Sequence, residues 1–392
     1  MISETEIMET NLFLRYRHSL DVYGSAIGQG LSDEQFVDLV SRLDARVANV
    51  AGTGFVVTPI VRLDVPGDRE IVAKVETANV GGSHKARHLF GLLLFDALEA
   101  MADQQDDRPP LAVASCGNAA LAAAVLARAA DRVPQVFVPV DADPVVLAHL
   151  HGSGVTVVTC ARSGGALGDP CMVGLQDAMA RGAQAFTVQG TTCPNAFDGA
   201  RTLGLELAEQ LATVLGDGAF DLGAFDLYLQ IGGGAMAVAT MDGLRRADQS
   251  GSTALRARLH PVQTVAAHPF VAAWNRLQPI LAAGPPTAWS AVIAASDVMQ
   301  PWPSAPSSVA TGILDDITYD WRPLMDHLVR SEGWPVLVSE GQLIDATALA
   351  ASQVQPPPDA TGAAGLAGAL CDPGPLDARP AVVVLSGVDR NA

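Results

Sequence analysis

The stretch from residue 111 to residue 267 alternates short apolar runs with longer helical segments, and this alternation restricts the fold most strongly. Short apolar runs are typical of buried strands, whereas the segments between them have helical spacing. A chain that alternates in this way forms mostly parallel sheets, because each helix returns the chain to the starting edge of the sheet. The predicted strands are 111–114, 135–139, 155–159, 185–188, 226–231 and 262–267, and the predicted helices are 119–130, 144–151, 174–181, 200–215 and 235–246.

The flanking segments extend the α/β pattern. Residues 31–50 predict a helix, because Ser32 and Gln35 form a capping-box pattern before apolar residues at helical spacing. The remaining predictions are β-rich runs at 55–57 and 71–73, loops at 282–310 and 352–361, a Gly/Ala-rich helix at 360–370 and a last buried strand at 381–385. At 392 residues, 49% of them hydrophobic, the chain exceeds one typical core, so two domains are expected.

Charge and cysteine usage narrow the class of protein. The net charge of −18 disfavours a nucleic-acid or anionic-membrane partner. The five cysteines are odd in number and show no CxxC spacing, which favours a reducing, cytoplasmic compartment. The N-terminus lacks the basic and apolar regions of a signal peptide, and no apolar run reaches the roughly 20 residues that span a membrane.

Lysine is nearly absent from this chain. Only Lys74 and Lys85 occur, against 22 arginines. An amine can lose its proton and form an imine, which a guanidinium cannot do, so a retained lysine is a candidate for chemistry. Codon bias explains the scarcity equally well.

Lys85 ends the run Gly81-Gly82-Ser83-His84-Lys85, whose glycines let the backbone approach a ligand closely. Taken alone, a lysine that opens a helix is more often a surface residue. A second turn, Ser115-Cys116-Gly117-Asn118, follows a predicted strand and opens a helix. The N–H groups of such a helix start can bind a carboxylate, although an ordinary N-cap turn has the same pattern.

A third motif, Gly232-Gly233-Gly234-Ala235, lies between a predicted strand and a predicted helix. Its backbone N–H groups can wrap a phosphate. A dinucleotide site would need an acid at the end of the next strand, where this chain has Ala266-Ala267-His268, so a single phosphate is favoured. The last motif, Leu385-Ser386-Gly387, follows the final predicted strand and is by itself only a turn.

Together and in this order, the motifs resemble those of the tryptophan synthase β-like (fold type II) enzymes that use pyridoxal 5'-phosphate (PLP). The resemblance runs from about Thr58 to Gly387, and is closest to threonine synthase and the serine/threonine dehydratases. It includes the stretches Asn195 to Glu206 and Thr361 to Leu370. It implies two α/β domains with mostly parallel sheets: a smaller, mobile domain of residues 77–185, and a larger domain of residues 1–76 and 186–392.

The resemblance also implies roles for single residues. Lys85 would hold the cofactor as a Schiff base and act as the base at the substrate Cα, with Ser83 beside it in the catalytic set. Asn118 would bond the phenolic oxygen of the cofactor, and Ser386 would meet its pyridine nitrogen. The other implied contacts are the cofactor phosphate with Gly232, Gly233, Gly234, Ala235 and His84, and the substrate carboxylate with Ser115, Cys116, Gly117 and Asn118.

A hydroxyl at the pyridine nitrogen makes the ring a weaker electron sink, which suits loss of a group from Cβ better than transamination. The resemblance thus implies β-elimination or β-replacement on a small amino acid such as serine or threonine, through an aminoacrylate, and it also implies a homodimer. One alternative is threonine synthase-like γ-chemistry on a phosphorylated substrate, with cations from Arg87, Arg162 or Arg201. An alternative of another class is a nucleotide-binding protein that is not an enzyme.

Four further features are predicted to be structural. His149 and His151 end a helix without partners for a metal, and Asp141 with Asp143 predicts a cap and turn. A packing role is expected for Cys116. The acidic residues Asp315, Asp316 and Asp320 are expected to be solvated, although a loop over the active site could use them.

Overall fold

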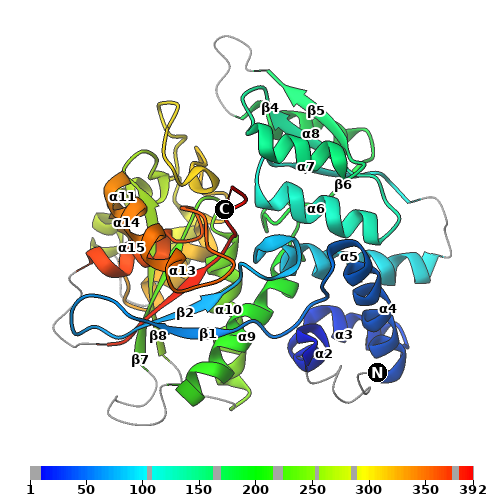
Figure 1. Ribbon diagram of the computed structural model, residues 1–392, viewed down its shortest axis with the longest axis horizontal. Helices are drawn as coiled ribbons and strands as arrows, with labels where there is room; N and C mark the ends of the chain where they lie inside the picture. The colour runs from blue at the N-terminus through cyan, green and yellow to red at the C-terminus, as the bar shows by residue number, and fades with distance from the viewer. Residues whose placement is uncertain are drawn as a thin grey trace. The chain divides into compact units, whose positions relative to one another are not determined.

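The computed structural model contains two compact units, formed by Met1–Val57 with Asn79–Thr202 and by Thr58–Ala78 with Leu203–Ala392. We call them unit 1 and unit 2 and describe each separately (Figure 1). The residues that the structure describes are 10–103, 108–161, 169–214, 224–251, 256–283, 289–372 and 379–391.

This division differs from the predicted domains in two places. Residues up to 57 and residues 186–202 belong with the unit that was expected to span only 77–185. The physical reason is a shared core. Phe13 and Phe55 pack against Phe90, with ring centroids 4.6 Å from that ring in both cases. The elements of this part are α2 (Leu12–Arg15), η1 (Arg17–Ser19), α3 (Asp21–Gly28), α4 (Asp33–Ala51), η2 (Val80–Gly82) and α5 (Lys85–Asp103).

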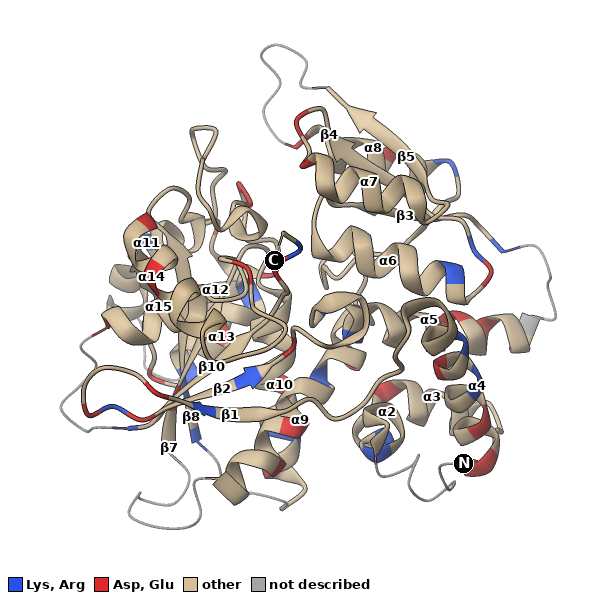
Figure 2. Ribbon diagram, in the orientation of Figure 1, with Lys and Arg blue, Asp and Glu red and all other residues tan. Residues whose placement is uncertain are grey.

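The predicted helix at 31–50 is confirmed as α4. Ser32 accepts a hydrogen bond from the N–H of Gln35, and the Gln35 side chain accepts one from the N–H of Ser32. The apolar residues Phe36 and Val40 are buried, whereas acidic residues lie along the outer face of the helix (Figure 2). The amphipathic pattern therefore fixed which side of α4 faces the core.

A parallel sheet in the order β5-β4-β3-β6 forms the rest of unit 1. Alternate residues of its strands face opposite layers of helices. Val113 and Val136 share a core with α6, while Ala112 and Phe137 pack against α8. The elements are β3 (Leu111–Ala114), α6 (Asn118–Ala129), β4 (Gln135–Pro139), α7 (Pro144–Gly152), β5 (Thr156–Cys160), α8 (Pro170–Ala180) and β6 (Gln184–Ala185).

Unit 2 is built on a sheet in the order β1-β2-β10-β7-β8-β9. Only the pairing of β1 with β2 is antiparallel among the described strands. The neighbouring strands β7 and β10 run parallel, so their carboxyl ends meet at one edge. The strands are β1 (Ile60–Leu63), β2 (Ile71–Val75), β7 (Ala224–Gln230), β8 (Arg256–Thr264), β9 (Val336–Val338) and β10 (Ala381–Leu385).

Helices pack onto this sheet. Tyr228, Val262 and Val383 share a core with α14 and α15, whereas α10 and α13 contact the strands β7 and β8. The helix α9 (Ala196–Val214) begins in unit 1 and ends in unit 2. The other helices are α10 (Ala235–Gln249), α11 (Pro269–Ala283), α12 (Trp289–Ala295), η3 (Thr311–Ile313), α13 (Trp321–Arg330), α14 (Glu340–Ala351) and α15 (Ala364–Cys371).

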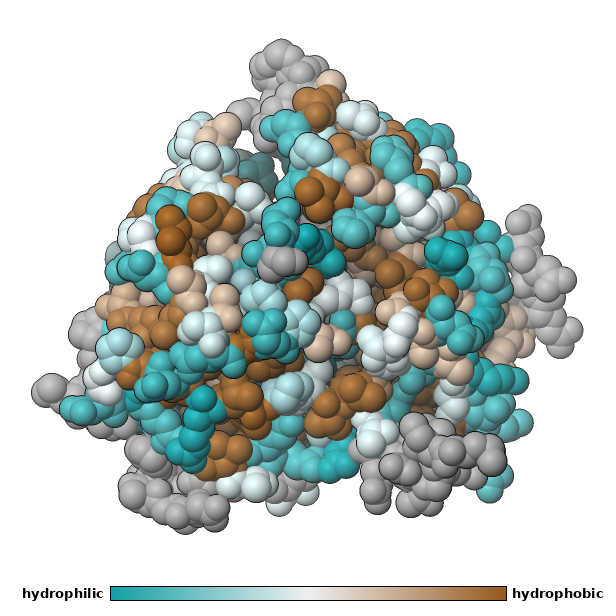
Figure 3. Space-filling model, in the orientation of Figure 1, coloured by the Kyte–Doolittle hydropathy of each residue, from teal (hydrophilic) through white to brown (hydrophobic). Residues whose placement is uncertain are grey.

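The predicted class, α/β with mostly parallel sheets, is confirmed, with local corrections. Of the predicted strand at 185–188, only Ala185 lies in a strand, β6. Residues 55–57 form no strand; the Phe55 side chain instead enters the core of unit 1. The expected loop at 282–310 contains α12, because Trp289 and Ile293 lie one helical turn apart and Ile293 is buried. On the surface, apolar side chains are interspersed with polar ones (Figure 3). None of the described helices is long and apolar enough to span a membrane.

Candidate cofactor and substrate site

The lysine loop of unit 1 is a tight turn that ends at the start of α5. Gly81 and Gly82 have φ angles of 65° and 71°, in the left-handed region that favours glycine. Ser83 is fully buried and extended, and its Oγ has no hydrogen-bond partner among the described residues. Lys85 then opens α5 and is half-buried. The predicted placement of Lys85 at a helix start is confirmed.

A cluster of basic groups surrounds this lysine. His84 is buried, and its ring centroid lies 5.8 Å from that of His88. Burial lowers the pKa of His88 well below its usual range, and the nearby charges on His84 and Lys85 lower it further. His88 is held through Nδ1, which lies 2.9 Å from the carbonyl oxygen of Ala196. We conclude that His88 is neutral at neutral pH and adds no positive charge near Lys85.

Close packing of glycines fixes the helix that carries Lys85. A Cβ on Gly199 would lie 2.2 Å from the carbonyl oxygen of Arg87 and 2.9 Å from the Cα of Gly91. The start of α9 therefore crosses α5 at backbone contact distance. Arg87 is fully buried and donates to the Thr202 hydroxyl at 3.0 Å. The orientation of α5 next to the lysine loop is set by this crossing.

The second turn of unit 1 joins β3 to α6. Gly117 is the N-cap residue and makes no side-chain cap, and its N–H donates to the Ser115 hydroxyl at 3.4 Å. The α6 helix packs against η2, and the Cα of Ala122 would lie 3.4 Å from a Cβ on Gly81. The structure therefore brings the lysine loop and the helix that begins at Asn118 together. Cys116 is exposed, so the packing role expected for it is wrong: the residue lies in the turn before α6 and not in the core.

In unit 2 the glycine turn links β7 to α10. Gly234 has a φ of 97° and caps α10 without a side chain. No acceptor among the described residues is bonded to the N–H groups of Gly233, Gly234 or Ala235. These donors lie at the positive end of the helix dipole, which is the arrangement that binds a phosphate.

The segment that holds Asp315 and Asp320 covers the glycine turn. The N–H of Asp320 donates to the Gly233 carbonyl at 2.8 Å, and a Cβ on Gly232 would lie 2.2 Å from Oδ2 of Asp315. Asp320 is 1% exposed and Asp315 is half-buried, so the expectation that they are solvated is wrong. Their backbone and side chains pack on the turn, because three successive glycines leave room there. In the sequence, the burial of these acidic residues is indicated by the apolar residues near them, Ile313 and Trp321.

Ser386 follows β10 and lies beside the end of β7. Its side chain is buried, and its Oγ accepts a hydrogen bond of 2.5 Å from Nε2 of Gln230. The parallel pairing of β7 with β10 explains this proximity, since both residues come at the carboxyl ends of their strands. Sequence reasoning missed Gln230. Its role could have been inferred from its position, because a polar residue at the end of an otherwise apolar strand must find a hydrogen-bond partner.

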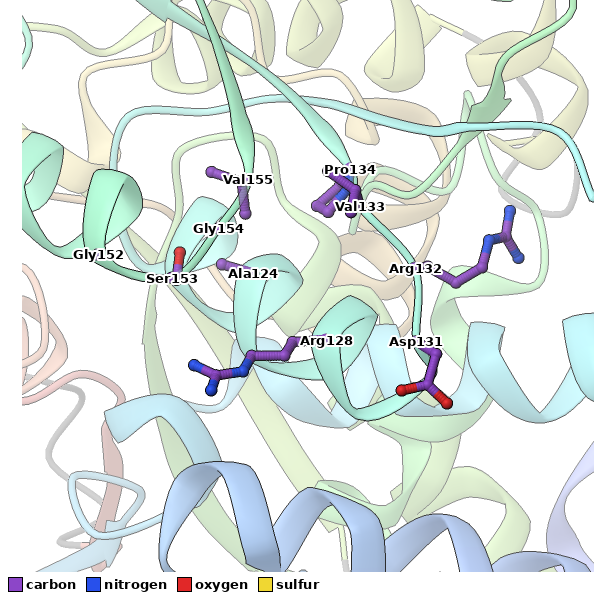
Figure 4. A pocket seen from close by; sticks show the side chains of 10 residues that line it. All are labelled: Ala124, Arg128, Asp131, Arg132, Val133, Pro134, Gly152, Ser153, Gly154 and Val155. Atoms are coloured by element: carbon purple, nitrogen blue, oxygen red, sulfur yellow. The ribbon is translucent and has the colours of Figure 1, made fainter.

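One other feature of unit 1 lies apart from the Ser115 turn. An open pocket is lined by Arg128, Arg132, Pro134 and Val155, and the two arginine side chains extend in opposite directions (Figure 4). Pro134 and Val155 precede β4 and β5, so the pocket lies at the amino ends of the parallel strands, away from the Ser115 turn. Within the described ranges, no three His, Cys, Asp or Glu side chains are grouped so that they could hold a metal ion.

The fold and the turns define a class: α/β proteins that bind a phosphorylated ligand at glycine-rich turns after parallel strands. The model of the family described as "Pyridoxal-phosphate dependent enzyme" matches residues 53–387, and the chain therefore belongs to this family. Its cofactor is PLP. A search of the curated proteins finds no match.

Solved structures resemble the chain at low sequence identity. Maize serine racemase is 17% identical, with a TM-score of 0.64, over 90% of this chain and 94% of that one. The processed threonine deaminase isoform 2 from Solanum lycopersicum is 15% identical, with a TM-score of 0.60, over 92% of each chain. Diaminopropionate ammonia lyase from Escherichia coli is 14% identical, with a TM-score of 0.62, over 89% of each chain. At these identities the likeness confirms the tryptophan synthase β-like fold.

Proposed function

We propose that this enzyme carries out β-elimination or β-replacement on a small amino acid such as serine or threonine. Unit 1 would supply Lys85 and the Ser115–Asn118 turn, and unit 2 would supply the glycine turn and Ser386. PLP, when bound, draws electrons from the Cα of an amino acid that is attached to it. The residues of the chain would then determine which proton of the substrate is moved and which of its bonds reacts.

Each unit has groups that would suit one part of the cofactor. The N–H groups of Gly233, Gly234 and Ala235 are bonded to no acceptor among the described residues and would bind a phosphate. Lys85 would bond to the cofactor through Nζ and would move the proton at the substrate Cα. The start of α6, with Asn118, would bind the substrate carboxylate through its N–H groups. His84 and Ser83 flank Lys85 in the chain and would line the same site.

The observation that carries the proposal is the hydroxyl of Ser386 after β10. A carboxylate at this position would keep a proton on the pyridine nitrogen, whereas a hydroxyl does not. With a hydroxyl from Ser386 at this position, the site would suit a substrate that carries a leaving group at Cβ better than it would suit transamination. Relatives in fold named for serine and threonine support a substrate with a β-hydroxyl.

The alternative with γ-chemistry on a phosphorylated substrate has less support. It needs a second cluster of cations, yet Arg201 is ion-paired with Asp198 at 2.8 Å and with Asp21 at 2.5 Å. Arg87 is fully buried against Thr202. Arg162 lies outside the described residues. Two of the three candidate arginines are therefore engaged within unit 1, and membership of a PLP-dependent family removes the support for a nucleotide-binding protein.

The presence of only two lysines gives a direct test. The purified chain is loaded with PLP, reduced with borohydride, digested and mapped by mass spectrometry. We expect the pyridoxyl label on Lys85, unchanged labelling in Lys74→Arg and loss of the label in Lys85→Arg. Release of a keto acid and ammonia from serine or threonine, or product formation when a thiol is added, would then identify the reaction. A label on Lys74, or transamination as the main reaction, would overturn the proposal.

A further inference from the structure

Gln230 is surrounded by three oxygen atoms at the end of β7. Its Nε2 lies 2.5 Å from Oγ of Ser386, 3.1 Å from the carbonyl oxygen of Gly362 and 3.1 Å from that of Val384. The residue is 4% exposed, so these contacts are made away from water. A buried amide in such a setting has a defined orientation.

The contacts decide which end of the amide faces Ser386. Carbonyl oxygens only accept hydrogen bonds, so the atom facing Gly362 and Val384 must be the NH2 group. Ser386 lies on this same side. An amide nitrogen donates and does not accept, and the Ser386 oxygen is therefore the acceptor in its bond with Gln230.

This direction determines where the proton of Ser386 can point. A hydroxyl carries one proton, and that proton cannot lie between Oγ and the NH2 group of Gln230. We propose that Gln230 is a positioning residue, which sets Ser386 as the hydrogen-bond donor to the pyridine nitrogen and so keeps that nitrogen unprotonated. The inference rests on the proposed function, in which Ser386 meets this nitrogen.

The surrounding glycines are consistent with a specific placement of the amide. A Cβ on Gly365 would lie 2.8 Å from Oε1 of Gln230, and a Cβ on Gly362 would lie 2.5 Å from the carbonyl oxygen of Gly387. Glycine at both positions lets α15 and the turn before it approach the ends of β7 and β10. A purely structural Gln230 would tie these segments together without affecting the protonation of the ring.

The test measures the protonation of the ring nitrogen directly. PLP labelled with 15N at the ring is loaded into the protein, and the nitrogen chemical shift is recorded by NMR. We expect the shift of an unprotonated pyridine in the wild type. In Gln230→Glu the carboxylate would accept the Ser386 proton, leaving the serine oxygen as an acceptor, so the shift should move toward that of a pyridinium. Gln230→Met, which removes the donor without adding a charge, should move it less.

Gln263 provides a matched control. It is also fully buried, in the neighbouring strand β8, where its Oε1 accepts from the N–H groups of Phe270 and Val271. Gln263→Met should lower stability but leave the nitrogen shift unchanged.

The outcomes separate this inference from the function on which it rests. A wild type that takes up no PLP would overturn the proposed function and the inference with it. A labelled wild type with a protonated ring nitrogen, or equal shifts in wild type, Gln230→Glu and Gln230→Met, would overturn the inference alone. If a variant fails to fold, the protonation state of the ring nitrogen in the wild-type spectrum still tests the inference.

Discussion

Nζ of Lys74 lies 2.6 Å from Oε2 of Glu206, and both side chains are fully buried. Lys74 also donates to the carbonyl oxygen of Thr58 at 2.7 Å and to Gln210 at 2.8 Å. The amine is therefore surrounded by acceptors that stabilise its charge. One of the two lysines of the chain is thus part of the core of unit 2, which supports the proposal that Lys85 bonds to the cofactor.

The buried pair predicts a large loss of stability when one partner is removed. Lys74→Met leaves the Glu206 carboxylate buried without its cation, and should lower the free energy of unfolding by about 3–5 kcal/mol. The double variant Lys74→Met/Glu206→Leu should recover most of this loss, because neither charge is then buried. Urea unfolding of the three proteins measures the effect. Equal losses in the single and double variants would contradict the prediction.

The crossing of α5 and α9 predicts a steric effect at Gly199. The Gly199→Ala variant places a Cβ 2.2 Å from the Arg87 carbonyl oxygen, and the helices must separate, at a cost of about 1–3 kcal/mol. Gly24→Ala is the matched control. A Cβ at Gly24 in α3 has nothing within 4 Å, so alanine there should be neutral or stabilise by up to about 1 kcal/mol. Thermal unfolding compares the two, and a Gly199→Ala protein as stable as Gly24→Ala would disprove the close crossing.

Asp226 predicts a loss of stability in acid. Burial alone would raise the pKa of this carboxyl, but the nearby His260 and the hydrogen bond from Arg258 outweigh burial and lower the pKa from 3.8 to about 2. Arg69 and Arg258 contact the carboxylate at 2.8 and 2.7 Å. Since the folded pKa is depressed, the stabilisation is complete above about pH 4 and disappears as the pH falls toward 2.

The size of this contribution is on the order of 2 kcal/mol, because one pH unit corresponds to about 1.4 kcal/mol. Asp226→Asn should be less stable at neutral pH and should lack this part of the pH dependence. Chemical unfolding between pH 2 and pH 7 measures both. If wild type and variant lose stability in parallel across this range, Asp226 is not the group responsible.

The exposure of Cys116 predicts one fast-reacting thiol. Cys171 and Cys193 are buried, and burial raises the pKa of both thiols, so they are protonated and shielded at neutral pH. Iodoacetamide should modify Cys116 first in the native protein, and Cys116→Ser should remove the fast phase. Peptide mapping identifies the labelled residue. Rapid labelling of Cys193 in the folded protein would contradict the arrangement described for unit 1.

The local pattern of apolar residues and turn residues was sufficient to predict several strands of the two sheets. The strands at 111–114, 135–139 and 381–385 were predicted with the bounds that the structure gives. They are short apolar runs between turn residues, so nearby sequence alone decides them. The N-terminal segment was assigned to the wrong unit because Phe13 and Phe55 meet Phe90 only after long stretches of chain have folded.

The sequence by itself determined the α/β class, the positions of the four turns and the resemblance to PLP-dependent enzymes, because these depend on spacing and on glycine within short segments. Only the tertiary structure decided which lysine is buried in an ion pair, and which residues cover the glycine turn. It also revealed the bond between Gln230 and Ser386, which lie 156 positions apart in the chain. Such contacts depend on strand order and register, which place distant residues together and leave no mark in the local pattern.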